Sequence, residues 1–232
     1  MKRTFSLLGF ILLVFIIGVI ACRHQPLFDT GNTLPPNTST TPCSPDTAYF
    51  VNDVMPIITS NCAMASCHDN ITAKEGLRLT SYNGVRSIVS PGNATGSDLY
   101  KEIIKTSGGR MPPPPMPALS AAQKLIIQKW INQGAKNNAC AGRCDTTQFT
   151  FSGAIKPLLD NRCVGCHNPA NLGGSVDLST YANVKVVALN GKLLGSIKQQ
   201  TGYSPMPKNG YKLSDCEITQ VSKWIANGSL NN

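Results

Sequence analysis

The sequence lacks the side-chain arrangements on which most hydrolytic and phosphoryl-transfer enzymes depend. It has no paired carboxylates, no Ser/His/Asp arrangement and no phosphate-binding glycine loop, and its 12 acidic residues are scattered. Aromatic residues make up only 6% of the chain, and no sustained alternation of apolar and polar residues predicts a β-strand. Histidine is also scarce, with three in 232 residues, at His24, His68 and His167. These absences disfavour such enzyme classes and a β-rich fold.

Residues 1–22 predict a bacterial lipoprotein signal peptide. Lys2 and Arg3 precede an apolar run from Leu7 to Ala21, which is short for a membrane span. The run ends in a pattern that resembles a lipobox, so we expect cleavage before Cys22 and a lipid on that residue. An uncleaved membrane anchor is the alternative. Either one exports the remaining chain to the periplasmic or cell-surface side of a bacterial membrane, where disulfides persist.

Residues 23–42 are rich in Pro, Thr, Asn and Ser and predict a flexible tether. The formal net charge is +9, which becomes +7 when Lys2 and Arg3 are removed. This charge favours redox partner proteins with an acidic docking face, or an anionic membrane surface. Nucleic acid is not an expected partner, because the chain is exported and has no recognition motif.

The most specific motif is Cys163-Val-Gly-Cys166-His167. Two thiols separated by two residues, with an imidazole directly after the second, form the attachment pattern of a c-type haem. The thiols add to the haem vinyl groups as thioethers, and His167 binds the iron. A zinc site usually needs a second pair of ligands, and a disulfide would leave His167 without a role. A variant with four residues between the thiols lies upstream at Cys62, Cys67 and His68.

The sequence around the two motifs repeats with a period of roughly a hundred residues. Cys43 and Cys144 each lie 19 residues before the first cysteine of a motif. Other matched positions are Phe50 and Phe151, Pro56 and Pro157, Tyr82 and Tyr181, Trp130 and Trp224, and Gly134 and Gly228. We therefore expect two duplicated domains, residues 43–142 and 143–232, each with a haem attached to its motif.

Each domain is predicted to be all-α, with a few short helices wrapped around the haem. A closing helix is expected in each, because capping boxes precede apolar residues at helical spacing; the boxes are Ser120 with Gln123 and Ser214 with Glu217. Gly134 and Gly228 suit the positions that follow a helix end. An opening helix is expected from about Asp46 and about Asp145, with a kink or an end at Pro56 and Pro157.

The histidine count restricts the iron ligands. His24 lies in the tether, so two haems with two histidine ligands each are excluded. Methionine is the remaining soft ligand, and His/Met coordination raises the reduction potential. Met111 and Met206 occupy matching positions before a proline and are the expected sixth ligands, with Met116 as an alternative in the first domain. Met55 and Met64 have no counterparts and are expected to be core or loop residues.

The four remaining cysteines are expected to form two disulfides. We favour the pairs Cys43–Cys140 and Cys144–Cys216, which would tie the first helix of each domain to its last. A Cys140–Cys144 bridge across the joint between the domains is the alternative.

Residues 43–232 resemble a tandem pair of class I cytochrome c domains of the planctomycete type. The resemblance is carried by Phe-x-x-Asp-Val-x-Pro-Ile-Ile before the first motif, by Arg110-Met-Pro-Pro-Pro, and by the terminal Ser-x-x-Gln and Trp-Ile helix. It implies covalent haem, with His68 and His167 as proximal ligands and Met111 and Met206 as distal ligands. The sequence departs from the family pattern in the four residues between Cys62 and Cys67.

These features favour a lipid-anchored di-haem cytochrome that passes single electrons and is not an enzyme, because His/Met coordination leaves no open iron position. One alternative is a haem enzyme, such as a peroxidase or an oxidoreductase subunit, with an open iron in the first domain if Met111 is not a ligand. Another is a mono-haem protein whose first domain has become a binding module.

Overall fold

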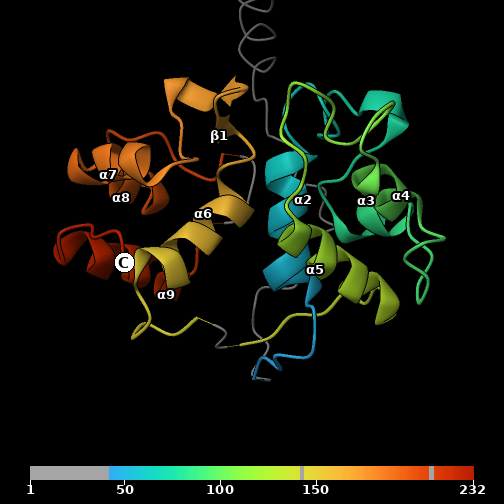
Figure 1. Cartoon of the computed structure of the whole chain (residues 1–232), viewed down its shortest axis with the longest axis horizontal. Coiled ribbons are helices and arrows are strands. Elements are labelled where there is room, and N and C mark those ends of the chain that lie inside the picture. The colour runs from blue at the N-terminus through green and yellow to red at the C-terminus, as the bar shows by residue number, and fades with distance from the viewer. Residues whose placement is uncertain (1–41, 142–143, 209–211) are drawn as a thin grey trace, which may run out of the picture. The chain divides into compact units, whose positions relative to one another are not determined.

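The computed structural model describes residues 42–141, 144–208 and 212–232, and these lie within one compact unit that runs from Leu34 to Asn232 (Figure 1). Regular structure in this part of the chain is almost entirely helical, as predicted. The predicted signal peptide, Cys22 and His24, together with nearly all of the tether, lie outside the described residues. None of the described helices has the length and apolar character needed to cross a membrane.

The two sequence repeats fold into the same order of elements (Figure 1). The first contains η1 (Phe50–Val54), α2 (Met55–Asn61), η2 (Lys74–Gly76), α3 (Tyr82–Arg86), α4 (Asp98–Ile104) and α5 (Ala121–Asn132). The second contains η3 (Phe151–Ile155), α6 (Lys156–Arg162), η4 (Gly173–Ser175), α7 (Tyr181–Leu189), α8 (Lys192–Ile197) and α9 (Asp215–Ala226). A short antiparallel hairpin in the second repeat pairs β1 (His167–Asn168) with β2 (Asn171–Leu172).

The opening helices begin later than the expected starts at about Asp46 and Asp145. They begin at Phe50 and Phe151, each with one π-helical turn that leads into α2 or α6. In the second repeat the N–H and the hydroxyl of Thr147 both donate to the carboxylate of Asp145, at 2.8 and 2.7 Å. Such local bonds compete with helix formation, and this explains the later start.

The helices do not end at the two matched prolines. Pro56 and Pro157 lie in the first turn of α2 and α6, directly after the π-helical turns. Proline has no N–H to donate to the preceding turn, and the change from π-helical to α-helical bonding falls directly before each proline. The helices therefore continue past the prolines to Asn61 and Arg162, immediately before the motif cysteines.

Each repeat has its own apolar core, built around a trio of aromatic rings. The ring of Phe50 lies 5.1 Å from Tyr82 and 5.3 Å from Trp130, measured between centroids. In the second repeat, Phe151 lies 5.0 Å from Tyr181 and 5.6 Å from Trp224. The two tryptophans are almost fully buried. The residues matched in the sequence repeat therefore pack in the same way in both cores.

The closing helices α5 and α9 have the predicted boundaries. Each begins with a complete capping box, in which the side chains of the cap serine and of the residue at the third helical position bond to each other's backbone N–H. Each is followed by a glycine in the left-handed region, with φ of 95° at Gly134 and 86° at Gly228.

The favoured disulfide pairing is confirmed. Cys43 is bonded to Cys140, 97 residues away, and Cys144 is bonded to Cys216, 72 residues away. The Cys140–Cys144 alternative is thereby excluded. The first bridge joins the segment before η1 to the segment after α5, and the second joins the segment before η3 to the first turn of α9. Each disulfide thus closes one repeat on itself.

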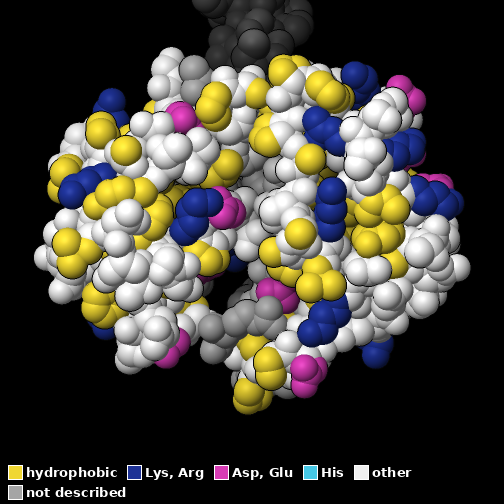
Figure 2. Space-filling view, viewed as in Figure 1, with side chains coloured by type: hydrophobic (Ala, Val, Ile, Leu, Met, Phe, Trp, Pro, Cys, Tyr) yellow, Lys and Arg dark blue, Asp and Glu magenta, His cyan; other side chains and the backbone are white. Residues whose placement is uncertain are grey.

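Basic side chains are spread over the visible surface of the molecule and form no single dense patch on that face (Figure 2). Several are paired, including Lys101 with Asp98 at 3.0 Å. The pair between Arg162 and Glu217, at 2.8 Å, is the best shielded of the described ion pairs, with 19% and 15% of the two side chains exposed. It joins the end of α6 to the first turn of α9, so it braces the helix that leads into the second motif.

Candidate functional site

Both motifs begin at the carboxyl end of a helix. The N–H of Cys62 donates to the carbonyl of Ile58 at 2.8 Å, and the N–H of Cys163 donates to the carbonyl of Leu159 at 2.8 Å. The first cysteine of each motif is therefore fixed by the last turn of α2 or α6. Because those helices carry buried core residues on their other faces, the thiol positions are set by the core of each repeat.

Each motif then folds back, so that its histidine returns to its first cysteine. The N–H of His167 donates to the carbonyl of Cys163 at 3.0 Å, and the N–H of His68 donates to the carbonyl of Cys62 at 3.1 Å. The first motif has two more residues, yet it makes the same bond. The extra length is taken up by a turn in which the N–H of Cys67 donates to the carbonyl of Met64 at 3.0 Å. The insertion therefore leaves the relation between the first cysteine and the histidine unchanged.

The two imidazoles are held in the same way. Nδ1 of His68 lies 3.1 Å from the carbonyl oxygen of Lys74, and Nδ1 of His167 lies 3.3 Å from that of Val176. A carbonyl oxygen only accepts hydrogen bonds, so Nδ1 carries the proton and the lone pair is on Nε2. A histidine that binds a metal is typically oriented by such a bond from its other nitrogen. Both histidines are thus prepared to donate Nε2 to an iron.

The four motif cysteines, Cys62, Cys67, Cys163 and Cys166, are outside the disulfides. Burial, reinforced by the neighbouring Cys67, raises the pKa of the Cys62 thiol from 9.0 to about 12. Burial likewise raises the pKa of Cys163 to about 12, and that of Cys166 is raised by burial and by Cys67. Thiols with these pKa values are neutral at physiological pH. They are poor thiolate ligands, whereas covalent attachment removes the need to ionise in the folded protein.

The zinc interpretation finds no support in the described residues. Nowhere among them do three or more His, Cys, Asp or Glu side chains gather in a group that could hold a metal ion. A structural zinc site needs four such ligands at one point. Thioether attachment to a macrocycle makes no such demand, because the thiols bind the periphery of the cofactor and only the imidazole binds the iron.

The two predicted methionine ligands occupy equivalent positions. The N–H of Met111 donates to the carbonyl of Glu102 on α4, and the N–H of Met206 donates to the carbonyl of Ser196 on α8, both at 3.1 Å. Both side chains are partly exposed. Among the described residues no hydrogen bond links either methionine to its histidine, and ligands on opposite faces of a macrocycle would make none. Their role as iron ligands stays a prediction.

The other methionines differ from this pair. Met55 and Met64 are buried, as expected for core residues. Met116 lies in a turn of the proline-rich loop, where its N–H donates to the carbonyl of Pro113 at 3.0 Å. Its own carbonyl accepts a bond from Nη2 of Arg110 at 2.8 Å. The second repeat has no matching arrangement, so Met116 lacks the equivalence that favours Met111.

Arg110, which directly precedes Met111, has an environment that the sequence did not predict. Nη1 of Arg110 is buried and has no hydrogen-bond partner among the described residues. Sequence alone could not reveal it, because the burial of one guanidinium nitrogen depends on the fold of the whole loop. A buried cationic donor without a partner fits a cofactor that carries negative groups, as haem does through its carboxylates. The residues present therefore fit covalent haem at this motif.

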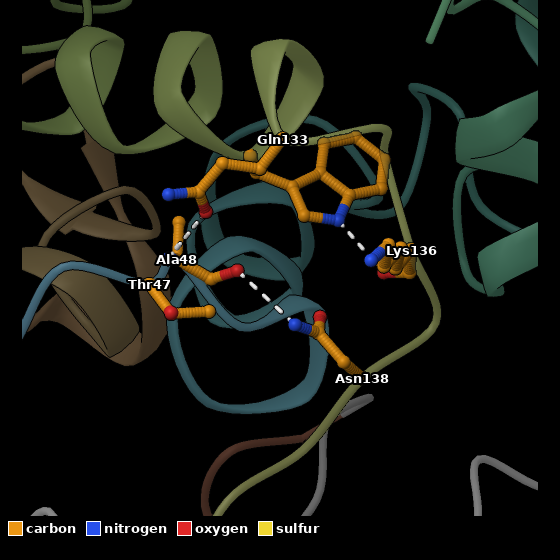
Figure 3. A pocket seen from close by; sticks show the side chains of 6 residues that line it. Thr47, Ala48, Gln133, Lys136 and Asn138 are labelled. Atoms are coloured by element: carbon orange, nitrogen blue, oxygen red, sulfur yellow. Dashed lines mark hydrogen bonds between the residues drawn. The ribbon is translucent and has the colours of Figure 1, made fainter. Parts of the chain in front are cut away.

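A surface pocket in the first repeat does not belong to the motifs. It is lined by Thr47, Ala48, Trp130, Gln133, Lys136 and Asn138 (Figure 3). The N–H of Ala48 donates to Oε1 of Gln133 at 2.9 Å, and Nε1 of Trp130 donates to the carbonyl of Lys136 at 2.9 Å. The first bond holds the segment before η1 against the end of α5, and the second ties the segment after α5 back to that helix. The second repeat forms the equivalent tryptophan bond, from Trp224 to Leu230, so this region is structural.

A protein family described as planctomycete cytochrome c has a model that matches residues 65–115. The matched segment contains Cys67, His68, Arg110 and Met111, so it begins inside the first motif, after Cys62, and extends into the proline-rich loop. It supports a cytochrome c-type domain that binds haem covalently and carries electrons. Neither a curated protein nor a solved structure matches the chain.

Proposed function

We propose that this chain is an exported, lipid-anchored electron carrier with two covalently attached haems, one on each motif. The observation that carries the proposal is the repeated orientation of the imidazoles, in which a backbone carbonyl binds Nδ1 and leaves Nε2 for the iron. Both copies of the motif keep this orientation, although the first has a longer spacing between its cysteines. The second motif also has the spacing typical of haem attachment.

The first motif is assigned a haem despite its longer spacing. The bond between the backbone of His68 and Cys62 has the same partners as the bond between His167 and Cys163. The chain between Cys62 and Cys67 absorbs the insertion in a local turn that includes Ser66 at φ 70°. Cys67 is followed directly by His68 in the sequence, as haem attachment requires.

When bound, haem supplies a one-electron couple at its iron. In this proposal the chain's own residues determine how that couple behaves. Cys62, Cys67, Cys163 and Cys166 fix the cofactor by thioether bonds. The Nε2 atoms of His68 and His167 and the sulfurs of Met111 and Met206 would bind the iron. Coordination filled in this way would exclude substrate from the iron, and methionine ligation would raise its reduction potential, which suits a carrier and disfavours an enzyme.

The proposed partners follow from charge and from the amino terminus. The net charge, +9 for the full chain and +7 without Lys2 and Arg3, favours redox proteins whose docking faces are acidic, because opposite charge accelerates encounter. A lipid on Cys22 would keep the carrier at a bacterial membrane, and residues 23–42 would give it reach.

The methionine assignment is the part of this proposal most open to direct test. Met111→Leu should abolish the sulfur-to-iron charge-transfer band of one haem and lower one of two one-electron potentials, because leucine cannot bind iron. Met206→Leu should do the same to the other haem. Both changes are measured by absorption spectroscopy and redox titration of the full-length, haem-loaded protein.

Met116→Leu is the matched control, because it removes a thioether from the same loop. It should leave both potentials and both bands in place. If Met116→Leu removes the band and Met111→Leu does not, the ligand assignment is wrong. If neither change affects the first haem, its iron is not bound by methionine, and an enzyme with an open iron position becomes the better interpretation.

A further inference from the structure

Arg110 has an unusual electrostatic environment. Its Nη2 donates to the carbonyl of Met116 at 2.8 Å, but Nη1 is buried and unpartnered among the described residues. In the part of the chain that the structure describes, the only other buried side-chain nitrogen or oxygen without a partner is the hydroxyl of Ser229, which is neutral. A buried cationic donor without a partner is costly, so its persistence in a fold indicates an anion that it binds.

The nearby acidic group on α4 does not supply that anion. Glu102 binds Lys105 through both carboxylate oxygens, at 2.6 and 2.7 Å. Its backbone carbonyl is the acceptor for the N–H of Met111. The carboxylate of Glu102 is therefore already neutralised by Lys105, and Nη1 of Arg110 needs a different partner.

The position of Arg110 in the sequence indicates what that partner is. It immediately precedes Met111, so the loop that brings the proposed sixth ligand to the iron also carries the guanidinium. Haem bears two carboxylates at its edge, and a guanidinium binds a carboxylate with a geometry that few other groups match.

We propose that Nη1 of Arg110 donates a hydrogen bond to a carboxylate of the haem held by Cys62, Cys67 and His68. This inference rests on the proposed function. The second repeat has Pro205 directly before Met206, so no guanidinium occupies the matching position there. The two haems are therefore electrostatically different. A cation beside the first haem favours the reduced iron, which carries one less positive charge, and so raises the potential of that haem alone.

The test uses full-length, haem-loaded protein and the variants Arg110→Gln, Arg110→Lys and Arg78→Gln. Arg78 is exposed and belongs to the same repeat, so Arg78→Gln removes the same charge at the surface. Arg110→Gln should raise the oxidised-to-reduced ratio of one haem about tenfold at fixed potential, which is a decrease of 59 mV. The other haem should not change. Infrared difference spectra between the reduced and oxidised forms should show a shifted haem carboxylate band.

Arg110→Lys should change the reduction potential of that haem only slightly, because lysine keeps the positive charge. It should still shift the carboxylate band, because lysine lacks the planar guanidinium that binds a carboxylate through two nitrogens. Arg78→Gln should shift neither. If the Arg110→Gln protein loses haem from the first motif, the Arg110→Lys protein provides the test. An unchanged haem carboxylate band in that protein overturns the inference. An unchanged potential and band in a fully loaded Arg110→Gln protein overturn it as well, and leave the carrier proposal standing. A wild-type first motif without haem overturns both.

Discussion

At the scale of single residues, backbone carbonyls fix the orientation of the two motif histidines. The carbonyl of Val176 accepts a hydrogen bond from Nδ1 of His167 at 3.3 Å, which leaves Nε2 available to bind a metal. The next residue, Asp177, fixes this loop: its carboxylate accepts the N–H of Ser179 at 2.8 Å and Nδ2 of Asn183 at 2.7 Å. The loop that orients the imidazole is thus tied to the first turn of α7.

The Asp177 bonds predict a pH dependence. Hydrogen bonds from Ser179 and Asn183 hold the pKa of Asp177 below its usual 3.8. The stabilisation is therefore present above the ordinary pKa of the unfolded chain and is lost as the pH falls through the lower pKa of the folded protein. Asp177→Ala should lower the thermal midpoint at neutral pH, and its difference from wild type should vanish in strong acid.

Thermal unfolding of the two proteins across the acid range checks this prediction. Asp98→Ala is a suitable control, because its ion pair with Lys101 is exposed and contributes little. A difference between Asp177→Ala and wild type that stays constant into strong acid would contradict the assigned role.

At the scale of elements, the closing helices define both repeats. Each capping box satisfies two backbone donors at the start of α5 or α9. In each closing helix, the side chain of the third helical residue, Gln123 or Glu217, also contacts another helix. Nε2 of Gln123 donates to the carbonyl of Asp160 at 3.1 Å, and Glu217 pairs with Arg162 at 2.8 Å. Both contacts are made to α6, which leads into the second motif, so the caps contribute to positioning that motif.

Ser120→Ala and Ser214→Ala should each lower the free energy of unfolding by about 1 kcal/mol, the usual cost of losing a helix cap. Ser222→Ala, in the interior of α9, should be neutral or slightly stabilising, because alanine is the better helix former there. Chemical denaturation of the three variants measures these differences. Equal stability of the cap variants and Ser222→Ala would show that the boxes do not stabilise the helices.

At the scale of the whole molecule, the chain consists of two copies of one fold, each with its own aromatic trio, motif and disulfide. Hydrogen bonds also join the repeats within the compact unit. The hydroxyl of Ser60 donates to the carbonyl of Asn161 at 2.9 Å, which links the ends of α2 and α6. These are the two helices that lead into the motifs. If each motif carries a haem, as proposed, we expect electron exchange between the two haems within one chain.

Much of this organisation could be predicted from the sequence, because it depends on local signals. The capping boxes and the glycines after the helices are local. The disulfide pairing could be predicted because each repeat has one cysteine near its start and one near its closing helix. Other features depend on segments that are distant in the chain or on the details of a turn. The start of η3 required the Asp145 turn, the bond between His68 and Lys74 required a folded loop, and the burial of Arg110 required the loop around it.

The measurement that tests the central claim most directly is the number of covalent haems on the exported protein, from intact mass and a haemochrome spectrum. We predict two haems on the wild type and one on each double variant, Cys62→Ser with Cys67→Ser and Cys163→Ser with Cys166→Ser. One haem on the wild type, retained in the first double variant and lost in the second, would contradict the account. The first repeat would then be a domain without haem, and the chain could not be a two-site carrier.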